Sequence, residues 1–338
     1  MKNIEILATL GPSSLNEDTI KKLTDNGVTL FRINLSHTSL EKVAPTIETI
    51  QKYSDVPISL DSEGAQIRNR TMNNGSVILK KGDQIKITSS NLSGDEKNIS
   101  FTPNNVVGSL EIGDLMEIDF HSTAIRIIKK GTDNCIAEVE VGGKIGSNKA
   151  ANLDRDIFLE PITPKDKEAI NIGKKMGIVN YALSFANRQE DVTKMRNLIG
   201  NKSRLISKIE SKSGLLNLKA ISEASDAILI DRGDLSRQVE IEKIPFLQRQ
   251  IIAVAKYIDV PVFVATNLLE SMIEQPTPTR AEVNDVISTL LMGADGLVLA
   301  AETAIGKYPC ETIIMVQKLI KQFHRWTPNT NINHMICE

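Results

Sequence analysis

Apolar, β-prone segments alternate with amphipathic segments along most of this chain, in the order expected for repeated βα units. The predicted strands cover residues 4–10, 29–35, 57–60, 180–185, 204–209, 227–231, 261–266 and 296–300. The predicted helices cover about 14–27, 39–53, 164–176, 191–199, 213–224, 245–257, 278–292 and 310–323. Eight such units in series are typical of a closed parallel barrel, so the predicted fold class is α/β, a (β/α)8 TIM barrel.

The pattern changes after the third predicted strand. Residues 70–155 hold short segments in which apolar and polar residues alternate, such as 84–88 and 137–141, separated by turn sequences rich in Asn, Asp and Gly. This pattern predicts antiparallel strands joined by tight turns. We therefore expect a small all-β domain, residues 70–155, inserted into a barrel formed by residues 1–69 and 156–338.

Charged and polar residues gather where the predicted strands end. Lys208 and Glu210 lie two residues apart at the end of the fifth strand, so their side chains share one face. Further polar residues at or just after strand ends are Arg32, Asn34, Ser36, Asp61, Arg68, Asp234, Thr266 and Glu302. Taken singly, each has a structural explanation, such as a strand-end ion pair for Lys208 and Glu210 or a helix cap for Asp231 or Asp234. Their convergence on the barrel end that carries active sites favours a catalytic mouth instead.

The residue types at this end predict the chemistry. Glu210 and Asp234 offer hard oxygen ligands, too few for a complete cage, which suits Mg²⁺ or Mn²⁺ completed by water and substrate. Lys208, Arg32 and Arg68 suit a phosphate or a carboxylate. No strand ends in a cysteine or histidine nucleophile, and no Gly-x-x-x-x-Gly-Lys phosphate loop is present. The set therefore predicts metal-assisted phosphoryl transfer.

Composition limits the kinds of binding partner and the cellular compartment that we expect for this chain. The formal net charge is −2 and aromatic residues make up 4% of the chain, which argues against a nucleic-acid or membrane surface. The three cysteines, Cys135, Cys310 and Cys337, are far apart and lack metal-ligand spacing, so we expect free thiols in a reducing compartment. With no apolar run of membrane-spanning length and no signal-like start, we expect a cytoplasmic protein.

Several sequence motifs occur in order at separate strand ends. They are ATLGPSS (8–14), FRINLSH (31–37), LDSEGAQIR (60–68), GGKIGSNK (142–149), SKIE (207–210), DRGDL (231–235), AT (265–266), LESM (269–272), PTRAEV (278–283) and ETA (302–304). Together they make the chain similar to the pyruvate kinase family over its whole length. The resemblance implies a glycolytic enzyme that transfers a phosphoryl group from phosphoenolpyruvate to ADP, giving pyruvate and ATP, with Mg²⁺ or Mn²⁺ and with K⁺ as a further cofactor. It also implies that the inserted domain is a lid and that the family's C-terminal regulatory domain is absent.

The resemblance assigns roles to the residues that match the family's motifs. The catalytic residues would be Lys208, which neutralises the phosphoryl group in flight, Arg32, which holds phosphate, and Thr266, on the proton path to the enolate. Phosphoenolpyruvate would be bound by Arg32, Lys208, Gly233, Asp234 and Thr266, and the nucleotide by Pro12, His37, Arg68 and Lys149. Glu210 and Asp234 would hold the divalent metal, and Asn34, Ser36, Asp61 and Ser62 the monovalent cation. Whether the chain forms a homo-oligomer is left open.

Departures from the family's motifs keep alternatives open. Glu63 and Ile305 stand where the family has lysine, and Ala300 where it has serine. The alternatives are an active short pyruvate kinase, a paralogous phosphotransferase or phosphoenolpyruvate-handling enzyme with another acceptor or substrate, and a non-catalytic ligand-binding module. The retained Lys208 and Thr266 speak against the module, and the departures speak for the paralogous enzyme. The active pyruvate kinase is the preferred interpretation.

Overall fold

The computed structural model describes residues 3–119, 122–331 and 333, and the chain forms two compact units. One unit, here called the barrel unit, combines Met1–Gly64 with Pro161–Glu338, and the other, the β unit, is Ala65–Glu160. Within the described ranges, no helix has the length and apolar character needed to span a membrane. Cys135 and Cys310 are free thiols, and Cys337 lies outside the described residues.

Eight parallel strands close the barrel unit, and the predicted TIM barrel is confirmed. The strands are β1 (Glu5–Thr9), β2 (Leu30–Asn34), β3 (Ile58–Asp61), β13 (Asn180–Leu183), β14 (Arg204–Ile209), β15 (Ala227–Asp231), β16 (Val262–Ala265) and β17 (Gly296–Leu299). They neighbour one another in the closed order β1-β17-β16-β15-β14-β13-β3-β2. Strands β3 and β13 pair directly, with Ser59 beside Asn180, although the whole β unit lies between them in the sequence.

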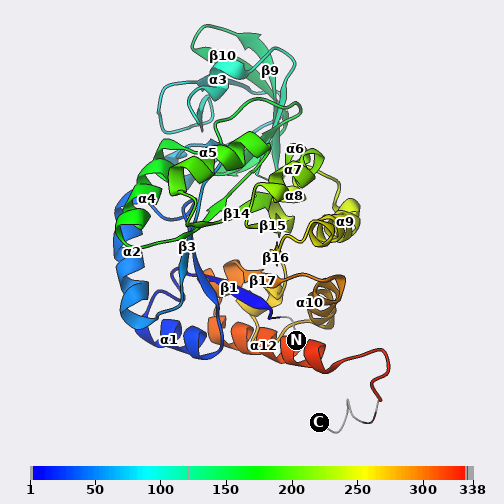
Figure 1. Cartoon of the computed structure of the whole chain (residues 1–338). Coiled ribbons are helices and arrows are strands. Elements are labelled where there is room, and N and C mark those ends of the chain that lie inside the picture. The colour runs from blue at the N-terminus through cyan, green and yellow to red at the C-terminus, as the bar shows by residue number, and fades with distance from the viewer. Residues whose placement is uncertain (1–2, 120–121, 332, 334–338) are drawn as a thin grey trace. The chain divides into compact units, whose positions relative to one another are not determined.

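Helices cover the outside of the barrel (Figure 1). They are α1 (Glu17–Asp25), α2 (Leu40–Tyr53), α4 (Pro164–Lys175), α5 (Gln189–Ile199), α6 (Lys212–Leu216), α7 (Leu218–Glu223), α9 (Ile244–Tyr257), α10 (Arg280–Met292) and α12 (Pro309–Arg325). Short helical segments, α8 (Arg232–Leu235), η2 (Ile241–Lys243), η3 (Glu270–Ile273) and α11 (Ala301–Ala304), lie between strands and helices. The single helix predicted for 213–224 is two helices, because Asn217 ends α6 and its side-chain amide donates to the carbonyls of Asn187 and Ser213.

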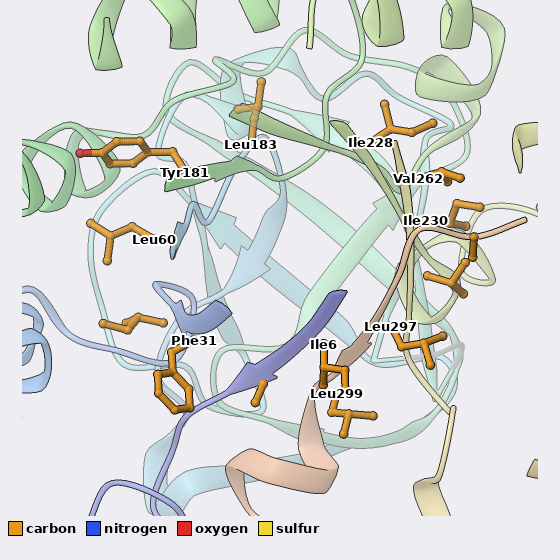
Figure 2. Close-up of a cluster of buried hydrophobic side chains, with 14 of the residues drawn as sticks. Ile6, Phe31, Leu60, Tyr181, Leu183, Ile228, Ile230, Val262, Leu297 and Leu299 are labelled. Atoms are coloured by element: carbon orange, nitrogen blue, oxygen red, sulfur yellow. The ribbon is translucent and has the colours of Figure 1, made fainter. Parts of the chain in front are cut away.

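Both faces of the barrel strands are buried, as their continuous apolar runs predict. Side chains such as Ile6, Phe31 and Leu297 point outward from the strands toward the helices (Figure 2). The intervening residues form a separate cluster inside the barrel, made of Leu7, Leu30, Ala182, Ile206, Ala227, Leu229, Phe263, Ala265 and Val298. This packed interior leaves the carboxyl ends of the strands, here called the mouth, as the place for polar side chains.

The β unit has its own closed barrel and its own apolar core. Its barrel strands are β4 (Ile67–Asn69), β6 (Gln84–Thr88), β7 (Asn98–Thr102), β8 (Leu115–Ile118), β9 (Thr123–Lys130), β10 (Asn134–Val141) and β12 (Ala150–Leu153). Strands β5 (Ser76–Leu79) and β11 (Gly143–Gly146) form a separate pair, with η1 (Asn73–Gly75) and α3 (Val106–Ser109) in the connections. The prediction of antiparallel strands is wrong for one pair: β6 and β7 are parallel, because residues 89–97 return the chain to the starting end of β6.

Replacing Gly296 with alanine tests the packing inside the barrel. A methyl group there would come within 2.3 Å of a ring carbon of Phe263 and 2.8 Å of the backbone carbonyl oxygen of Glu5. We expect Gly296→Ala to lower the free energy of unfolding by about 1–3 kcal/mol, measured by urea denaturation, because overpacking forces neighbouring groups to shift. Gly108→Ala is the matched control, since a methyl group at Gly108 would meet no atom of the described part of the chain within 4 Å. Equal losses in the two variants would contradict this explanation.

Candidate active site

A buried lysine lies near the carboxyl end of β14. The Lys208 ammonium nitrogen is 2.9 Å from Glu210 Oε1 and 3.2 Å from Asp61 Oδ2. It is also 3.7 Å from Asp231 Oδ2 and donates a 3.1 Å hydrogen bond to Ser184 Oγ. Burial by itself lowers the pKa of a lysine, but the charges of Asp61 and Glu210 outweigh it, so the pKa of Lys208 is raised above its ordinary value. The side chain is therefore a permanent cation.

Asp61, the last residue of β3, is held by two cations. Its Oδ2 accepts hydrogen bonds from Arg32 Nε at 2.6 Å and from Lys208 Nζ at 3.2 Å, and its Oδ1 accepts from Ser184 Oγ at 3.1 Å. Arg32 Nη1 donates to Thr9 Oγ1 at 2.9 Å. Burial alone raises the pKa of Asp61, but the charges of Arg32 and Lys208 more than offset it and hold that pKa below its ordinary value. Arg32, predicted to hold phosphate, is thus ion-paired with Asp61 at the mouth.

Glu210 is completely buried beside Lys208, as their shared strand face predicts. Its Oε2 accepts a 2.7 Å hydrogen bond from the backbone N–H of Phe185, a residue whose φ of 51° lies in the left-handed region. Its Oε1 is 2.9 Å from the Lys208 ammonium but accepts no hydrogen bond from the residues that the structure describes. Burial raises the pKa of Glu210 to about 8, against the opposing charge of Lys208 and with added repulsion from Asp231 and Asp234. The ionised form is therefore costly unless a further cation is present.

Glu210, Asp231 and Asp234 form an acidic group at the ends of β14 and β15. One carboxylate oxygen from each of them lies within 4.8 Å of those of the other two. Carboxylate oxygens are the ligands that Mg²⁺ and Mn²⁺ prefer. A buried oxygen without a hydrogen bond, such as Glu210 Oε1, is the kind of atom that a bound cation satisfies. The residues present therefore fit a divalent metal ion, and Arg237 Nε, 3.5 Å from Asp234 Oδ1, adds a further positive charge nearby.

Thr266 follows β16 and is fixed from two directions. Its hydroxyl donates a 2.6 Å hydrogen bond to Asp231 Oδ1, and its φ of 76° lies in the left-handed region. Its carbonyl accepts hydrogen bonds from Arg232 Nε at 3.0 Å and Nη2 at 2.6 Å, and Arg232 is paired with Asp285 at 2.7 Å. The backbone N–H of Gly233, predicted to meet the substrate, donates to Asp231 Oδ1 at 3.2 Å. Asp231 thus organises this part of the mouth.

The four residues predicted for a monovalent cation lie at the adjacent ends of β2 and β3. Asn34 is in register with Asp61, and its Oδ1 accepts a 2.9 Å hydrogen bond from the backbone N–H of Ser36. Ser62 Oγ accepts a 3.0 Å hydrogen bond from the backbone N–H of Ser184. The structure therefore brings this set together, and the side-chain oxygens of Asn34, Asp61 and Ser62 accept hydrogen bonds from protein groups.

The positions that depart from the family's motifs have different surroundings. Glu63 forms a 2.7 Å ion pair with Lys165, so the charge that it introduces is balanced within the barrel unit. Ala300 precedes α11, and its backbone N–H donates to the buried Glu302 carboxylate at 2.9 Å. Ile305 follows α11 and is 60% exposed. Two of the three changes alter the local charge: Glu63 replaces a cation with an anion that Lys165 neutralises, and Ile305 removes a cation.

The residues predicted to bind nucleotide are distributed over both units. In the barrel unit, Pro12 and His37 are exposed in the loops that follow β1 and β2. In the β unit, Arg68 donates a 2.9 Å hydrogen bond to a backbone carbonyl, and Lys149 lies 3.3 Å from Asp119. The joint action of these residues on a nucleotide stays a prediction.

The sequence interpretation missed three contributors to the mouth, namely Asp231, Ser184 and Thr9. Asp231 does cap α8, which was one interpretation of it, but it also contacts Lys208 and Thr266. Ser184 directly follows β13 and Thr9 is the last residue of β1. All three carry the signal used for the others, a polar residue at the carboxyl end of a predicted strand.

A family model described as "PK: Pyruvate kinase, barrel domain" matches residues 1–313. The chain is 36% identical over 331 residues to a pyruvate kinase of Thermotoga maritima, covering 95% of this chain and 71% of that protein. It is 34% identical over 330 residues to a pyruvate kinase of Methylorubrum extorquens, covering 96% of this chain and 69% of that protein. It is 32% identical over 325 residues to a pyruvate kinase of Staphylococcus saprophyticus, covering 93% of this chain and 56% of that protein.

Asp61→Asn tests how far the ion cluster depends on one carboxylate. The variant leaves Arg32 and Lys208 buried with less negative charge, and removing one partner of a buried ion pair costs about 3–5 kcal/mol. We expect a loss of this size in the free energy of unfolding at pH 7, measured by urea denaturation. The control, Asp55→Asn at an exposed position, should change it by less than about 0.5 kcal/mol.

The difference in stability between wild type and Asp61→Asn is also expected to depend on pH. The pKa of Asp61 is lower in the folded than in the unfolded chain, so its contribution to stability is present above the unfolded pKa of about 3.9. That contribution is lost as the pH falls further, through the folded pKa. The stability difference between wild type and Asp61→Asn should therefore shrink in acid. A difference that stays constant down to the acid unfolding transition would contradict the assigned pairing.

Proposed function

Since the chain belongs to the pyruvate kinase family, we propose that it transfers the phosphoryl group of phosphoenolpyruvate to ADP, giving pyruvate and ATP. The observation that carries this proposal is the buried Lys208 ammonium beside the acidic group of Glu210, Asp231 and Asp234 at the mouth of the barrel. Phosphoryl transfer depends on positioning and on neutralisation of charge rather than on a protein nucleophile. A fixed cation next to a site for a divalent metal ion supplies both.

In the proposed reaction, Glu210 and Asp234 hold Mg²⁺ or Mn²⁺. Such an ion, when bound, supplies positive charge that offsets the charge of the phosphate and carboxylate oxygens of the substrate. Lys208 stabilises the phosphoryl group as its bond to the enol oxygen breaks and its bond to the β-phosphate of ADP forms. Arg32 binds the same phosphate, with its guanidinium orientation fixed by Asp61. The charges are fixed before the substrate enters, so little reorganisation is needed during the transfer.

Departure of the phosphoryl group leaves the enolate of pyruvate, which gains a proton at C3 to give the keto product. Thr266 lies on the path of this proton. The carboxylate of the substrate binds beside the backbone N–H groups of Gly233 and Asp234, and before substrate enters, the Gly233 N–H donates to Asp231 Oδ1. The proposed net reaction consumes one proton for each phosphoryl group transferred. Hydrogen bonds hold Thr266 in place beside the acidic group. This fixed position supports its assignment to the protonation of C3, a step that needs a defined geometry.

The nucleotide and the monovalent cation complete the proposal. Pro12 and His37 from the barrel unit and Arg68 and Lys149 from the β unit bind ADP, and the β unit, predicted as residues 70–155, acts as a lid. K⁺ binds at the ends of β2 and β3, where the oxygens of Asn34, Ser36, Asp61 and Ser62 are close in the sequence and in the sheet register. Oxygen atoms from side chains and carbonyls are suitable ligands for such hard cations.

Phosphorus NMR of phosphoenolpyruvate with Mg²⁺ and ADP tests the proposed reaction. We expect the phosphoenolpyruvate signal to disappear while the signals of ATP appear, at a higher rate when K⁺ is present. Persistence of phosphoenolpyruvate with every nucleoside diphosphate would contradict the proposal. A shifted or broadened phosphate signal without turnover would instead indicate a binding module or a different acceptor.

Lys208→Met separates the chemistry from substrate binding. We expect the rate of phosphoryl transfer to fall by at least about 10²-fold, because a fixed charge aimed at the transition state is lost. The variant also leaves Asp61 and Glu210 buried with one cation fewer, so its folding is checked by circular dichroism and its Mn²⁺ binding by electron paramagnetic resonance. Lys219→Met, at an exposed lysine on α7, is the matched control. Transfer at the wild-type rate in folded Lys208→Met would remove Lys208 from the mechanism.

A further inference from the structure

Asp231 makes a set of contacts that an ordinary helix cap does not need. One oxygen, Oδ1, accepts hydrogen bonds from the Thr266 hydroxyl at 2.6 Å and from the Gly233 backbone N–H at 3.2 Å. The other oxygen, Oδ2, lies 3.7 Å from the Lys208 ammonium. Asp231 is in register with Ala265, the residue just before Thr266, so the pairing of β15 with β16 fixes the distance between carboxylate and hydroxyl.

The backbone of Thr266 is held in a conformation that a β-branched residue rarely adopts. Its φ of 76° lies in the left-handed region, and such conformations persist only where the surroundings over-determine them. The bidentate contact from Arg232 fixes the carbonyl. A methyl group at Gly233 would come within 2.8 Å of Thr266 Cγ2, so the loop after β15 packs closely against this side chain. Strain that is maintained in this way is typical of functional positions.

The direction of the Thr266 hydroxyl is set by its contact with Asp231. The hydroxyl lies 2.6 Å from Asp231 Oδ1, and that oxygen also accepts the backbone N–H of Gly233. Since the Asp231 oxygen acts as an acceptor, the single hydrogen of the Thr266 hydroxyl points at Asp231. The remaining lone pairs of Thr266 Oγ1 are therefore the part of the hydroxyl that is free to accept a hydrogen bond from another molecule.

We propose that Asp231 is a positioning residue for the protonation of the enolate, because it orients the Thr266 hydroxyl as an acceptor for the solvent molecule that protonates C3. The inference rests on the proposed function. In this step, the C3–H bond forms as an O–H bond of a water molecule bound to Thr266 breaks, and the hydroxide left behind takes a proton from bulk solvent. Asp231 does not touch the substrate; it acts through Thr266.

Exchange of the methyl protons of pyruvate with solvent measures this step without phosphoryl transfer. Proton NMR follows the loss of the methyl signal in D₂O, in the full chain with saturating Mg²⁺ and inorganic phosphate. We expect Asp231→Ala to slow this exchange by roughly 100-fold, the effect of a misplaced reacting group. Asp231→Asn should recover most of the rate, since the amide oxygen still accepts from Thr266 and Gly233. Saturating Mg²⁺ removes the effect of weaker metal binding after the loss of a nearby carboxylate.

A double-mutant cycle with Thr266→Val distinguishes positioning from a general loss of charge. Thr266→Val should slow exchange as much as Asp231→Ala does, and the double variant should be no slower than either, because the two residues act as one unit. Ser236→Ala, in the same loop but bonded to the Gly233 carbonyl, is the control that should exchange at the wild-type rate. Where Asp231→Ala does not fold, Asp231→Glu carries the test: it keeps the charge but displaces the carboxylate, and should also slow exchange.

The outcomes separate this inference from the function on which it rests. The positioning role would be overturned if Asp231→Ala exchanged at the wild-type rate, or if Asp231→Asn were as slow as Asp231→Ala. Either result would leave the proposed function intact, provided that the wild-type chain converts phosphoenolpyruvate and ADP. Fully additive losses in the double variant would also overturn it. If the wild-type chain itself formed no ATP from phosphoenolpyruvate and ADP, the proposed function would fail instead, and that result is read by phosphorus NMR before any variant is made.

Discussion

The ion pairs of Lys208 are the interaction on which the mouth of the barrel depends. A buried ammonium is tolerated only where carboxylates compensate for its lost hydration, and here Asp61 and Glu210 do so directly. Asp61 ends β3, Lys208 lies in β14, and Glu210 directly follows β14. Asp231, from β15, lies slightly farther from the Lys208 ammonium. A shift of one residue in any of these strands would turn its charged side chain to the opposite face. Charge compensation and strand register therefore support each other.

The same arrangement divides the mouth into two electrostatic regions. On the side of β1 to β3, Arg32 is paired with Asp61 and bonded to Thr9, so positive charge is held there in a fixed orientation. On the side of β14 to β16, the carboxylates of Glu210, Asp231 and Asp234 are close together, and burial, with added repulsion from the two aspartates, raises the pKa of Glu210. Lys208 lies between the two regions. In the proposed reaction, this separation of charge orients the substrate. Its phosphate needs the cationic region, and its metal-binding oxygens need the acidic region that would hold the metal ion.

Much of this architecture follows from local patterns, and the exceptions have identifiable causes. Buried parallel strands are continuous apolar runs, so the eight barrel strands and the location of the mouth were predictable from the sequence. The break at Asn217 and the parallel pairing of β6 with β7 depend on contacts with distant segments, which local periodicity does not contain. Likewise, the sequence placed Arg32 and Asp61 at strand ends, but only tertiary packing shows that they bond to each other. The roles of these residues toward substrate and nucleotide remain predictions.

The direct pairing of β3 with β13 has a consequence for how the chain folds. These strands must meet although the entire β unit separates them in the sequence, so closing the barrel carries the entropy cost of a long loop. That entropy cost grows only slowly with loop length. It is smaller if the intervening segment has already collapsed around its own core, because the effective loop is then shorter. Contacts of such high sequence separation slow folding, and they leave the edges of β3 and β13 exposed while the barrel is open. Early folding of the inserted segment would therefore shorten the time during which these two edges are available to other chains.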